Sequence, residues 1–186
     1  MGSILALVIP LVAFVVLAAA FIVLFRRASR ALTRTRDEER FRRAAEDLAK
    51  RVDESLAGVI ERIDAVRRHQ LDADAIAPNL EAAHDAVGRY AEEAKNLHGP
   101  VPAEDVRASL MAELDRAARG LEMVSHGCTL MAASGGRNRE LEAQTAIKRG
   151  YLNVLHAREA IARHAADAAT LVPADPSHQS PSSRSA

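Results

Sequence analysis

The sequence is poor in the residue types from which many binding and catalytic sites are built. Its 186 residues include one cysteine, Cys128, no tryptophan and only 3% aromatic residues. A single thiol forms no internal disulfide and supplies no multi-cysteine zinc site. Surfaces that stack bases or sugars need more aromatic side chains. The composition therefore argues against a base-stacking or sugar-binding platform.

A net charge is also absent. The chain has 25 Lys and Arg residues and 25 Asp and Glu residues, which gives a formal net charge of +0 at pH 7. Since phosphate binding depends on an excess of Lys and Arg, we expect no nucleic acid among the main partners. The sequence contains no G-x-x-x-x-G-K-[ST], G-x-S-x-G or H-E-x-x-H motif. We therefore expect a protein that is not an enzyme and that binds no cofactor and no metal.

One apolar segment is long enough to cross a membrane. Residues 4–25 carry no charged side chain. As a helix they would extend ~33 Å, against ~30 Å for the hydrocarbon core of a bilayer. A cleaved signal peptide is the alternative, but Met1-Gly2-Ser3 has no basic side chain and Phe21–Phe25 would leave the apolar run unfinished at the cut. We predict a transmembrane helix over 4–25, after a short extracytoplasmic N-terminus, 1–3.

A basic juxtamembrane segment, residues 26–36, follows the apolar run. Its arginines are Arg26, Arg27, Arg30, Arg34 and Arg36. The flank rich in Lys and Arg usually stays cytoplasmic. The sequence therefore predicts a single-pass protein of the cell membrane, with the N-terminus outside and residues 26–186 in the cytoplasm. Membrane lipid is an expected partner of these arginines, although we favour a role in topology over recognition of a specific lipid.

The apolar periodicity beyond residue 36 predicts an all-α cytoplasmic domain over 37–172. Apolar stripes at steps of three and four residues indicate four amphipathic helices. The first runs over about 37–69, the second from Pro78 to about 97, the third from Pro102 to about 133, and the fourth from an N-cap at Asn138 to about 168. Short connections favour an antiparallel up-and-down bundle. An extended, dimerising coiled coil is the rival, because both share this packing. The Ser- and Pro-rich tail, 173–186, is predicted to be disordered.

The predicted core stripes follow the helical period in each of the four segments. They comprise Phe41, Ala45, Leu48, Val52, Leu56, Val59, Ile63 and Val66; Leu80, Ala83, Val87, Tyr90, Ala94 and Leu97; Val106, Leu110, Leu114, Ala117, Leu121, Val124, Cys128 and Met131; and Ile147, Tyr151, Val154, Ile161, Ala165 and Ala168, with Leu141, Leu152 and Leu155 beside the last. Gly88, Gly120, Gly127 and Gly150 lie inside these helices, where they permit tight crossings or mark bends.

The most individual stretch for a binding site is residues 150–168. Arg158 falls in the stripe with Val154 and Ile161, where an apolar residue is expected. A pair with Glu81, Asp85, Glu113 or Asp115 across the bundle is one interpretation. We favour the other, an arginine at the stripe edge whose alkyl stem covers the core. Tyr151, Asn153 and Arg158 are the candidate residues of a polar core or ligand site.

The cysteine and the histidines offer weaker candidates. Cys128 shares a stripe with Val124 and Met131, so we interpret it as a buried, structural thiol. His156 and His164 stand eight positions apart, or ~12 Å along a helix, and cannot share one ion. Isolated surface histidines are the favoured interpretation.

One segment resembles a known family. IAPNLEAAHDAVGRYA is similar to the Pro-Asn-Leu helix start of the LemA family, whose members also have an outward N-terminus, one membrane helix and a cytoplasmic helical domain. The resemblance covers about one helix. We transfer no residue role from it.

These patterns predict a membrane-anchored helical protein that acts as an interaction or scaffold module at the cytoplasmic membrane face. The expected partner is a protein, either a second copy or another membrane-associated chain. A ligand-binding or sensor bundle with a polar site near Arg158 is the alternative function.

Overall fold

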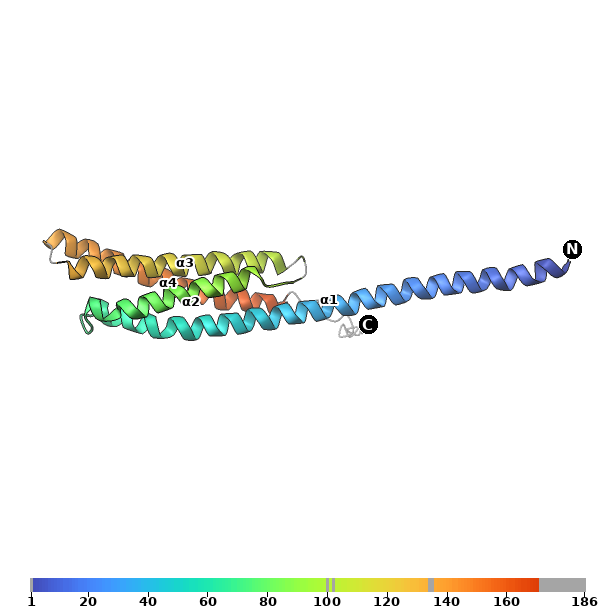
Figure 1. Ribbon diagram of the computed structural model, residues 1–186, viewed down its shortest axis with the longest axis horizontal. Helices are drawn as coiled ribbons and strands as arrows, with labels where there is room; N and C mark the ends of the chain where they lie inside the picture. Colours follow the sequence, from blue (N-terminus) through green and yellow to red (C-terminus); the bar gives the residue numbers. More distant parts are fainter. Residues whose placement is uncertain (1, 100, 102, 134–135, 171–186) are drawn as a thin grey trace, which may run out of the picture. The chain divides into compact units, whose positions relative to one another are not determined.

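The fold is all-α over the residues described by the computed structural model, 2–99, 101, 103–133 and 136–170, with side chains at Phe21 and from residue 36 onward. The elements are α1 (Gly2–Arg67), the 3-10 helix η1 (Ala73–Ile76), α2 (Ala77–Lys95), α3 (Ala103–Ala132) and α4 (Arg137–Thr170), with no strand in this part of the chain (Figure 1). The chain divides into two units, residues 1–37 and 38–186. The predicted disordered tail, 173–186, lies outside the described residues.

The first unit is helical from residue 2. Phe21 is 67% exposed and Arg36 is also exposed. The other side chains of the apolar segment, and those of Arg26, Arg27, Arg30 and Arg34, lie outside the described ones. Within the portion that is described, no helix is both long and apolar enough to traverse a bilayer. The transmembrane helix over 4–25 therefore stays a prediction.

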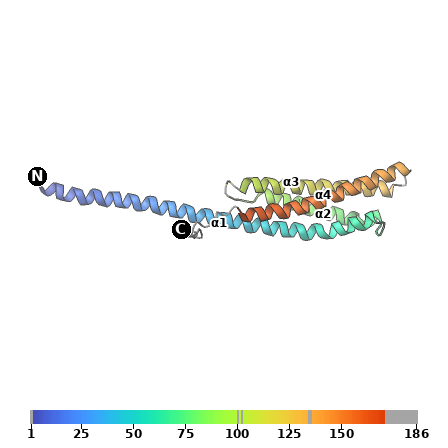
Figure 2. The same cartoon turned by 180° about the vertical axis from the view of Figure 1, so that it is seen from behind.

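The second unit is an antiparallel four-helix bundle made by α2, α3, α4 and the part of α1 from residue 38. The helices alternate in direction, and α3 packs against both α2 and α4 (Figures 1 and 2). The α1 segment contacts α2 through Arg51 and Glu93 and contacts α4 through Asp53 and Arg158. The stripes thus meet within one chain, as the predicted up-and-down bundle requires, and do not form an extended coiled coil.

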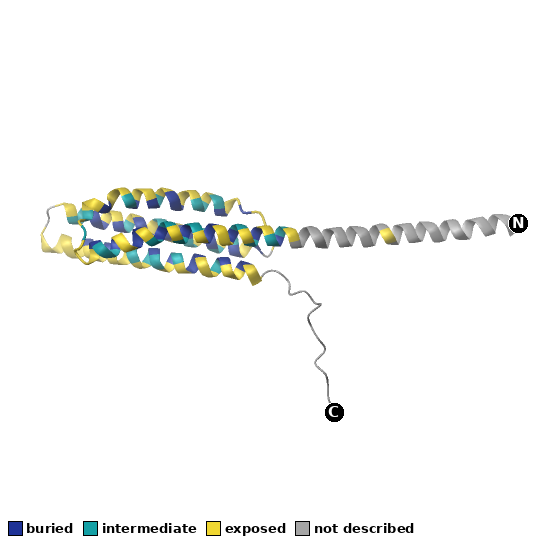
Figure 3. Ribbon diagram, turned by 90° about the horizontal axis from the view of Figure 1, so that it is seen from below, coloured by how far each residue is buried: buried dark blue, intermediate teal, exposed yellow. Residues whose placement is uncertain are grey.

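The core follows the predicted stripes closely. Every stripe residue is buried except Tyr90, Met131 and Tyr151, which are partly buried. In Figure 3 the buried positions lie on the inward sides of the four helices and the exposed positions on the outward sides. The assignment of Leu141 and Leu152 to this core is wrong, since they are 56% and 39% exposed. Small residues occupy the corresponding part of α4.

Three glycines let α3 and α4 approach closely. A Cβ built on Gly150 would lie 2.5 Å from the carbonyl oxygen of Gly120, and one on Gly127 would lie 2.9 Å from that of Ala143. Ala143, Gly150 and Ala157 are spaced seven residues apart on the same side of α4 and are all buried. We call this contact, made by Gly120, Gly127, Ala143, Gly150 and Ala157, the small-residue seam. Gly88 has nothing within 4 Å of its built Cβ and belongs to no crossing.

α1 ends two residues before the predicted end at about residue 69, and its hydrogen bonds explain why. The N–H of Gln70 donates to the Ala65 carbonyl at 2.9 Å and the N–H of His69 to the Val66 carbonyl at 3.0 Å, a Schellman pattern that closes the helix at Arg67. His69 sits at φ 58°, where glycine is usual and another residue costs ~1–2 kcal/mol.

The remaining helix starts differ slightly from the prediction. η1 precedes α2, and Pro78 lies in the first turn of α2 as predicted. α4 begins at Arg137, so Asn138 as its N-cap is wrong. The carbonyl of Gly136 already accepts the N–H of Arg139 at 2.9 Å. The helix therefore starts two residues earlier than an N-cap at Asn138 would place it.

Candidate functional site

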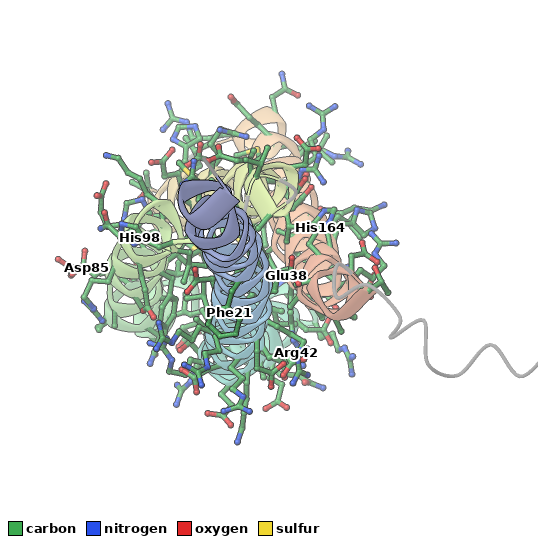
Figure 4. All side chains as sticks on the ribbon, turned by 90° about the vertical axis from the view of Figure 1, so that its right-hand side faces the viewer. Phe21, Glu38, Arg42, Asp85, His98 and His164 are labelled. Atoms are coloured by element: carbon green, nitrogen blue, oxygen red, sulfur yellow. The ribbon has the colours of Figure 1, made fainter. Side chains whose placement is uncertain are left out.

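Arg158 is the candidate site residue whose partner the structure identifies. Its Nε donates to Asp53 Oδ1 of α1 at 2.6 Å. The partners of the less favoured interpretation, Glu81, Asp85, Glu113 and Asp115, are wrong, because they lie on α2 and α3 whereas Arg158 pairs with Asp53 of α1. Asp85 points outward from α2 in the view along the helices (Figure 4), and Glu113 pairs with Arg116.

The Asp53–Arg158 pair lies at the edge of the bundle, because the two side chains are 47% and 30% exposed. The hydrogen bond from Arg158 lowers the pKa of the Asp53 carboxyl, against an opposing effect of desolvation, and Asp53 raises the pKa of Arg158. Solvent screening at this exposure limits such pairs to ~1 kcal/mol or less. The pair therefore links α1 to α4 at the surface and contributes little to the stability of the fold.

We expect Asp53→Asn to reduce the free energy of unfolding at pH 7 by about 0.5–1 kcal/mol, because it removes the charge on which the pair depends. A carboxyl whose pKa is lowered on folding stabilises above its unfolded pKa and loses that contribution as the pH falls through the folded value. The difference between the two proteins should therefore shrink as the pH falls through the lowered pKa of folded Asp53. Chemical denaturation at several pH values measures it, with Asp115→Asn at an exposed position of α3 as the control. A difference that persists in acid would exclude the ionic interpretation.

Tyr151, Asn153 and Arg158 do not converge on one site. Tyr151 and Arg158 both contact α1, since the Arg67 guanidinium stacks over the Tyr151 ring at 4.5 Å from its centroid. Asn153 lies on the other side of α4, beside Arg116, Arg119 and Met123 of α3. The structure thus divides the predicted polar site between two faces of α4, and Arg158 is already held by Asp53.

A second polar cluster joins α1 to α2. Arg51 donates from Nη1 to Glu93 Oε2 at 3.0 Å, and Glu93 raises the pKa of Arg51. The Tyr90 hydroxyl lies 2.8 Å from Ser55 Oγ and 3.4 Å from the Arg51 carbonyl oxygen. These contacts link α1 to α2, as Asp53–Arg158 links α1 to α4. Nothing in the sequence distinguished Asp53 or Glu93 from other solvent-facing acids, so their partners were not predicted.

An open groove of ≈ 570 Å³ lies between α2 and α3. Leu80 and Leu121 form its floor, and Glu81, His84, Glu122 and His126 line its sides. His84 Nε2 lies 3.3 Å from Glu122 Oε1 across the groove. We call this feature the α2–α3 groove. Its polar groups place two carboxylates around an apolar floor, an arrangement suited to a basic segment of a partner.

Within the described part of the chain, no three His, Cys, Asp or Glu side chains are grouped so that they could hold one metal ion. Cys128 is buried at 5% exposure. Burial, with a smaller contribution from Asp74, raises the pKa of its thiol to about 11. His164 of α4 is partly buried and lies 3.8 Å from Asp167, and His98 is exposed and follows the end of α2 (Figure 4).

Comparisons with protein families, with curated proteins and with solved structures find no match to this chain. The resemblance to the LemA family therefore rests on the segment quoted above alone. The function has to be argued from the chain itself.

Proposed function

We propose that this chain is a single-pass membrane protein whose helical bundle acts as a protein interaction or scaffold module at the cytoplasmic membrane face, without catalysis. One chain combines two features, and this combination carries the proposal. Residues 4–25 form an uncharged segment followed by arginines, and the apolar stripes of the bundle are buried within the same chain.

The sequence of the first unit supports the anchor. An uncharged helix of this length gains several kcal/mol on insertion, since each Leu, Ile, Val or Phe near the centre contributes ~0.3–0.6 kcal/mol. The arginines on its C-terminal flank favour retention of that flank in the cytoplasm. A protein held in this way meets membrane-associated partners at a raised effective concentration.

The closed core of the bundle supports recognition through polar surface. In the described bundle, the large apolar side chains that remain exposed are Val101, Leu141 and Leu152, and they are too scattered along the sequence to form a helical stripe. The α2–α3 groove combines an apolar floor with Glu81 and Glu122. We propose that it receives a basic segment of a partner protein, because charge complementarity governs the choice and rate of such encounters.

The anchor is tested by membrane extraction and by topology. We expect the full chain to stay in the membrane pellet after an alkaline wash and to require detergent for release. Val15→Arg with Val16→Arg should release most of the chain, because each arginine at the centre of the segment costs ~2.5–3.5 kcal/mol. The matched control is Val101→Arg, at an exposed position. A C-terminal reporter should be active in the cytoplasm. Recovery of the uncut wild-type chain in the aqueous fraction would refute the anchor.

The interaction is tested by site-specific photocrosslinking in native membranes. A crosslinker at Ser125, in the α2–α3 groove, should capture a partner, whereas one at the exposed Arg62 of α1 should not. Glu81→Lys should abolish capture by cancelling the negative charge of the groove, and Glu142→Lys on α4 should leave it unchanged. A product of twice the chain's mass would identify a second copy as the partner. Equal capture from both positions would refute the groove as the interaction surface.

A further inference from the structure

A second, more enclosed cavity lies at the end of the bundle opposite Glu38. The last residues of α3 and the first residues of α4 extend past the connection between α1 and α2 (Figures 1 and 2). A cavity of ≈ 200 Å³ lies at this end of the bundle. It is bordered by Val66 and Arg67 of α1, by His69 after α1, by Met131 of α3 and by Gln144, Ile147 and Lys148 of α4. It is separate from the α2–α3 groove and shares no residue with it.

The cavity has an apolar floor. Val66 and Ile147 are each only 2% exposed, and Met131 is partly buried beside them. An engineered apolar cavity of ~150 Å³ is known to hold benzene. The volume here accommodates a ring of that size with one small substituent.

Cationic groups surround the open side of the cavity. Arg67 is fixed in place by Asp64, which accepts from Arg67 Nη1 at 3.0 Å, and by its stacking on Tyr151. Asp64 also pairs with Arg68, so one carboxylate serves two guanidinium groups. Lys148 borders the cavity as well and forms no ion pair with any described residue. The rim therefore carries an excess of positive charge.

His69 gives an independent reason to regard the cavity as a binding site. It borders the cavity and stands at φ 58°, in the left-handed region. Glycine would fill this helix-ending position without strain. A side chain held in a strained conformation beside a cavity is a recognised feature of binding sites. The imidazole adds a hydrogen-bond donor to the cationic rim.

We propose that this cavity binds a small organic monocarboxylate with an apolar body about the size of a phenyl ring. The apolar body rests on Val66 and Ile147, and the carboxylate accepts hydrogen bonds from Lys148 and His69 next to Arg67. Charge-assisted hydrogen bonds to a carboxylate supply the selectivity, and burial of the ring supplies most of the affinity.

Methyl NMR of the full chain in detergent tests this proposal with benzoate as the probe. The sequence contains four methionines, and Met131 borders the cavity, so its ¹³C-methyl signal reports occupancy. Benzoate should shift Met131 in a saturable manner and leave Met111 and Met123 unchanged. Benzyl alcohol, which lacks the charge, and acetate, which lacks the ring, should each bind at least about tenfold more weakly.

Matched variants separate binding from folding. Lys148→Gln should weaken benzoate binding about tenfold, and Arg149→Gln, one residue away and outside the cavity, should not. His69→Gly should raise the melting temperature of the bundle by relieving the strain and should also weaken binding. Equal affinity for benzoate and benzyl alcohol, unchanged affinity in Lys148→Gln, or equal shifts at all methionines would overturn the proposal.

Discussion

Gly150→Ala is expected to destabilise the bundle by a net ~1–2 kcal/mol, although the same substitution in an open helix stabilises. The added Cβ would lie 2.5 Å from the Gly120 carbonyl oxygen, 2.6 Å from Val124 Cγ2 and 2.9 Å from the Val124 amide nitrogen. Two of these atoms belong to the backbone of α3 and cannot rotate away, so the helices must separate. Overpacking typically costs ~1–3 kcal/mol, occasionally more, and exceeds the helix gain of ~1 kcal/mol.

Gly58→Ala and Gly88→Ala are the matched controls. Nothing lies within 4 Å of a Cβ built at either position. Each should stabilise by about 0.5–1 kcal/mol, because alanine has the higher helix propensity and loses less conformational entropy on folding. Urea denaturation of the full chain in detergent, followed by circular dichroism, measures all three. A stabilised Gly150→Ala variant would show that α3 and α4 are not in close contact there.

The Cys128 thiol is expected to react with iodoacetamide at pH 8 at least about a hundredfold more slowly in the folded protein than in denaturant. Only the thiolate reacts, and a thiol pKa raised from 9.0 to about 11 lowers the thiolate fraction by that factor. Burial of the sulfur at 5% residue exposure shields it further. The rate in the folded state should rise about tenfold per pH unit up to about pH 11.

A relocated cysteine provides the control for this measurement. His126→Cys in a Cys128→Ala background places the thiol two residues away, on the exposed side of α3, where alkylation should approach the rate of the unfolded chain. Mass spectrometry of alkylated protein gives both rates. Fast labelling of native Cys128 would contradict its burial and would reopen a redox or nucleophilic role for it.

Much of the bundle was predictable because its apolar residues follow the helical period. The stripe from Phe41 to Val66 is wholly buried, since each of its members faces inward on a regular helix. The prediction failed on α4, where Leu141 and Leu152 were assigned to the core. Leu141 and Leu152 were assigned to the core because their side chains are large and apolar. The buried positions of α4 that face α3 are instead occupied by Ala143, Gly150 and Ala157. A close approach of two helices favours the smallest side chains, which carry a weak hydrophobic signal.

The polar contacts were less predictable than the core. A stripe position occupied by Arg158 indicated an unusual contact, and the structure supplies one, with Asp53. The identity of that partner depends on which helices are neighbours across the bundle, which local periodicity does not encode. The same holds for the cavity of ≈ 200 Å³. Its residues come from three helices, and only the left-handed His69 marks it locally.

The small-residue seam also bears on how this chain can diverge among its descendants. The space that a side chain would need at Gly120 or Gly150 is filled by the main chain of the opposing helix. A change at one position is therefore tolerated only if the other helix shifts to accommodate it. Homologues of this protein should substitute their exposed charged residues freely and conserve Gly120 and Gly150 together. Joint conservation of the two glycines would therefore identify distant homologues after the rest of the sequence has diverged.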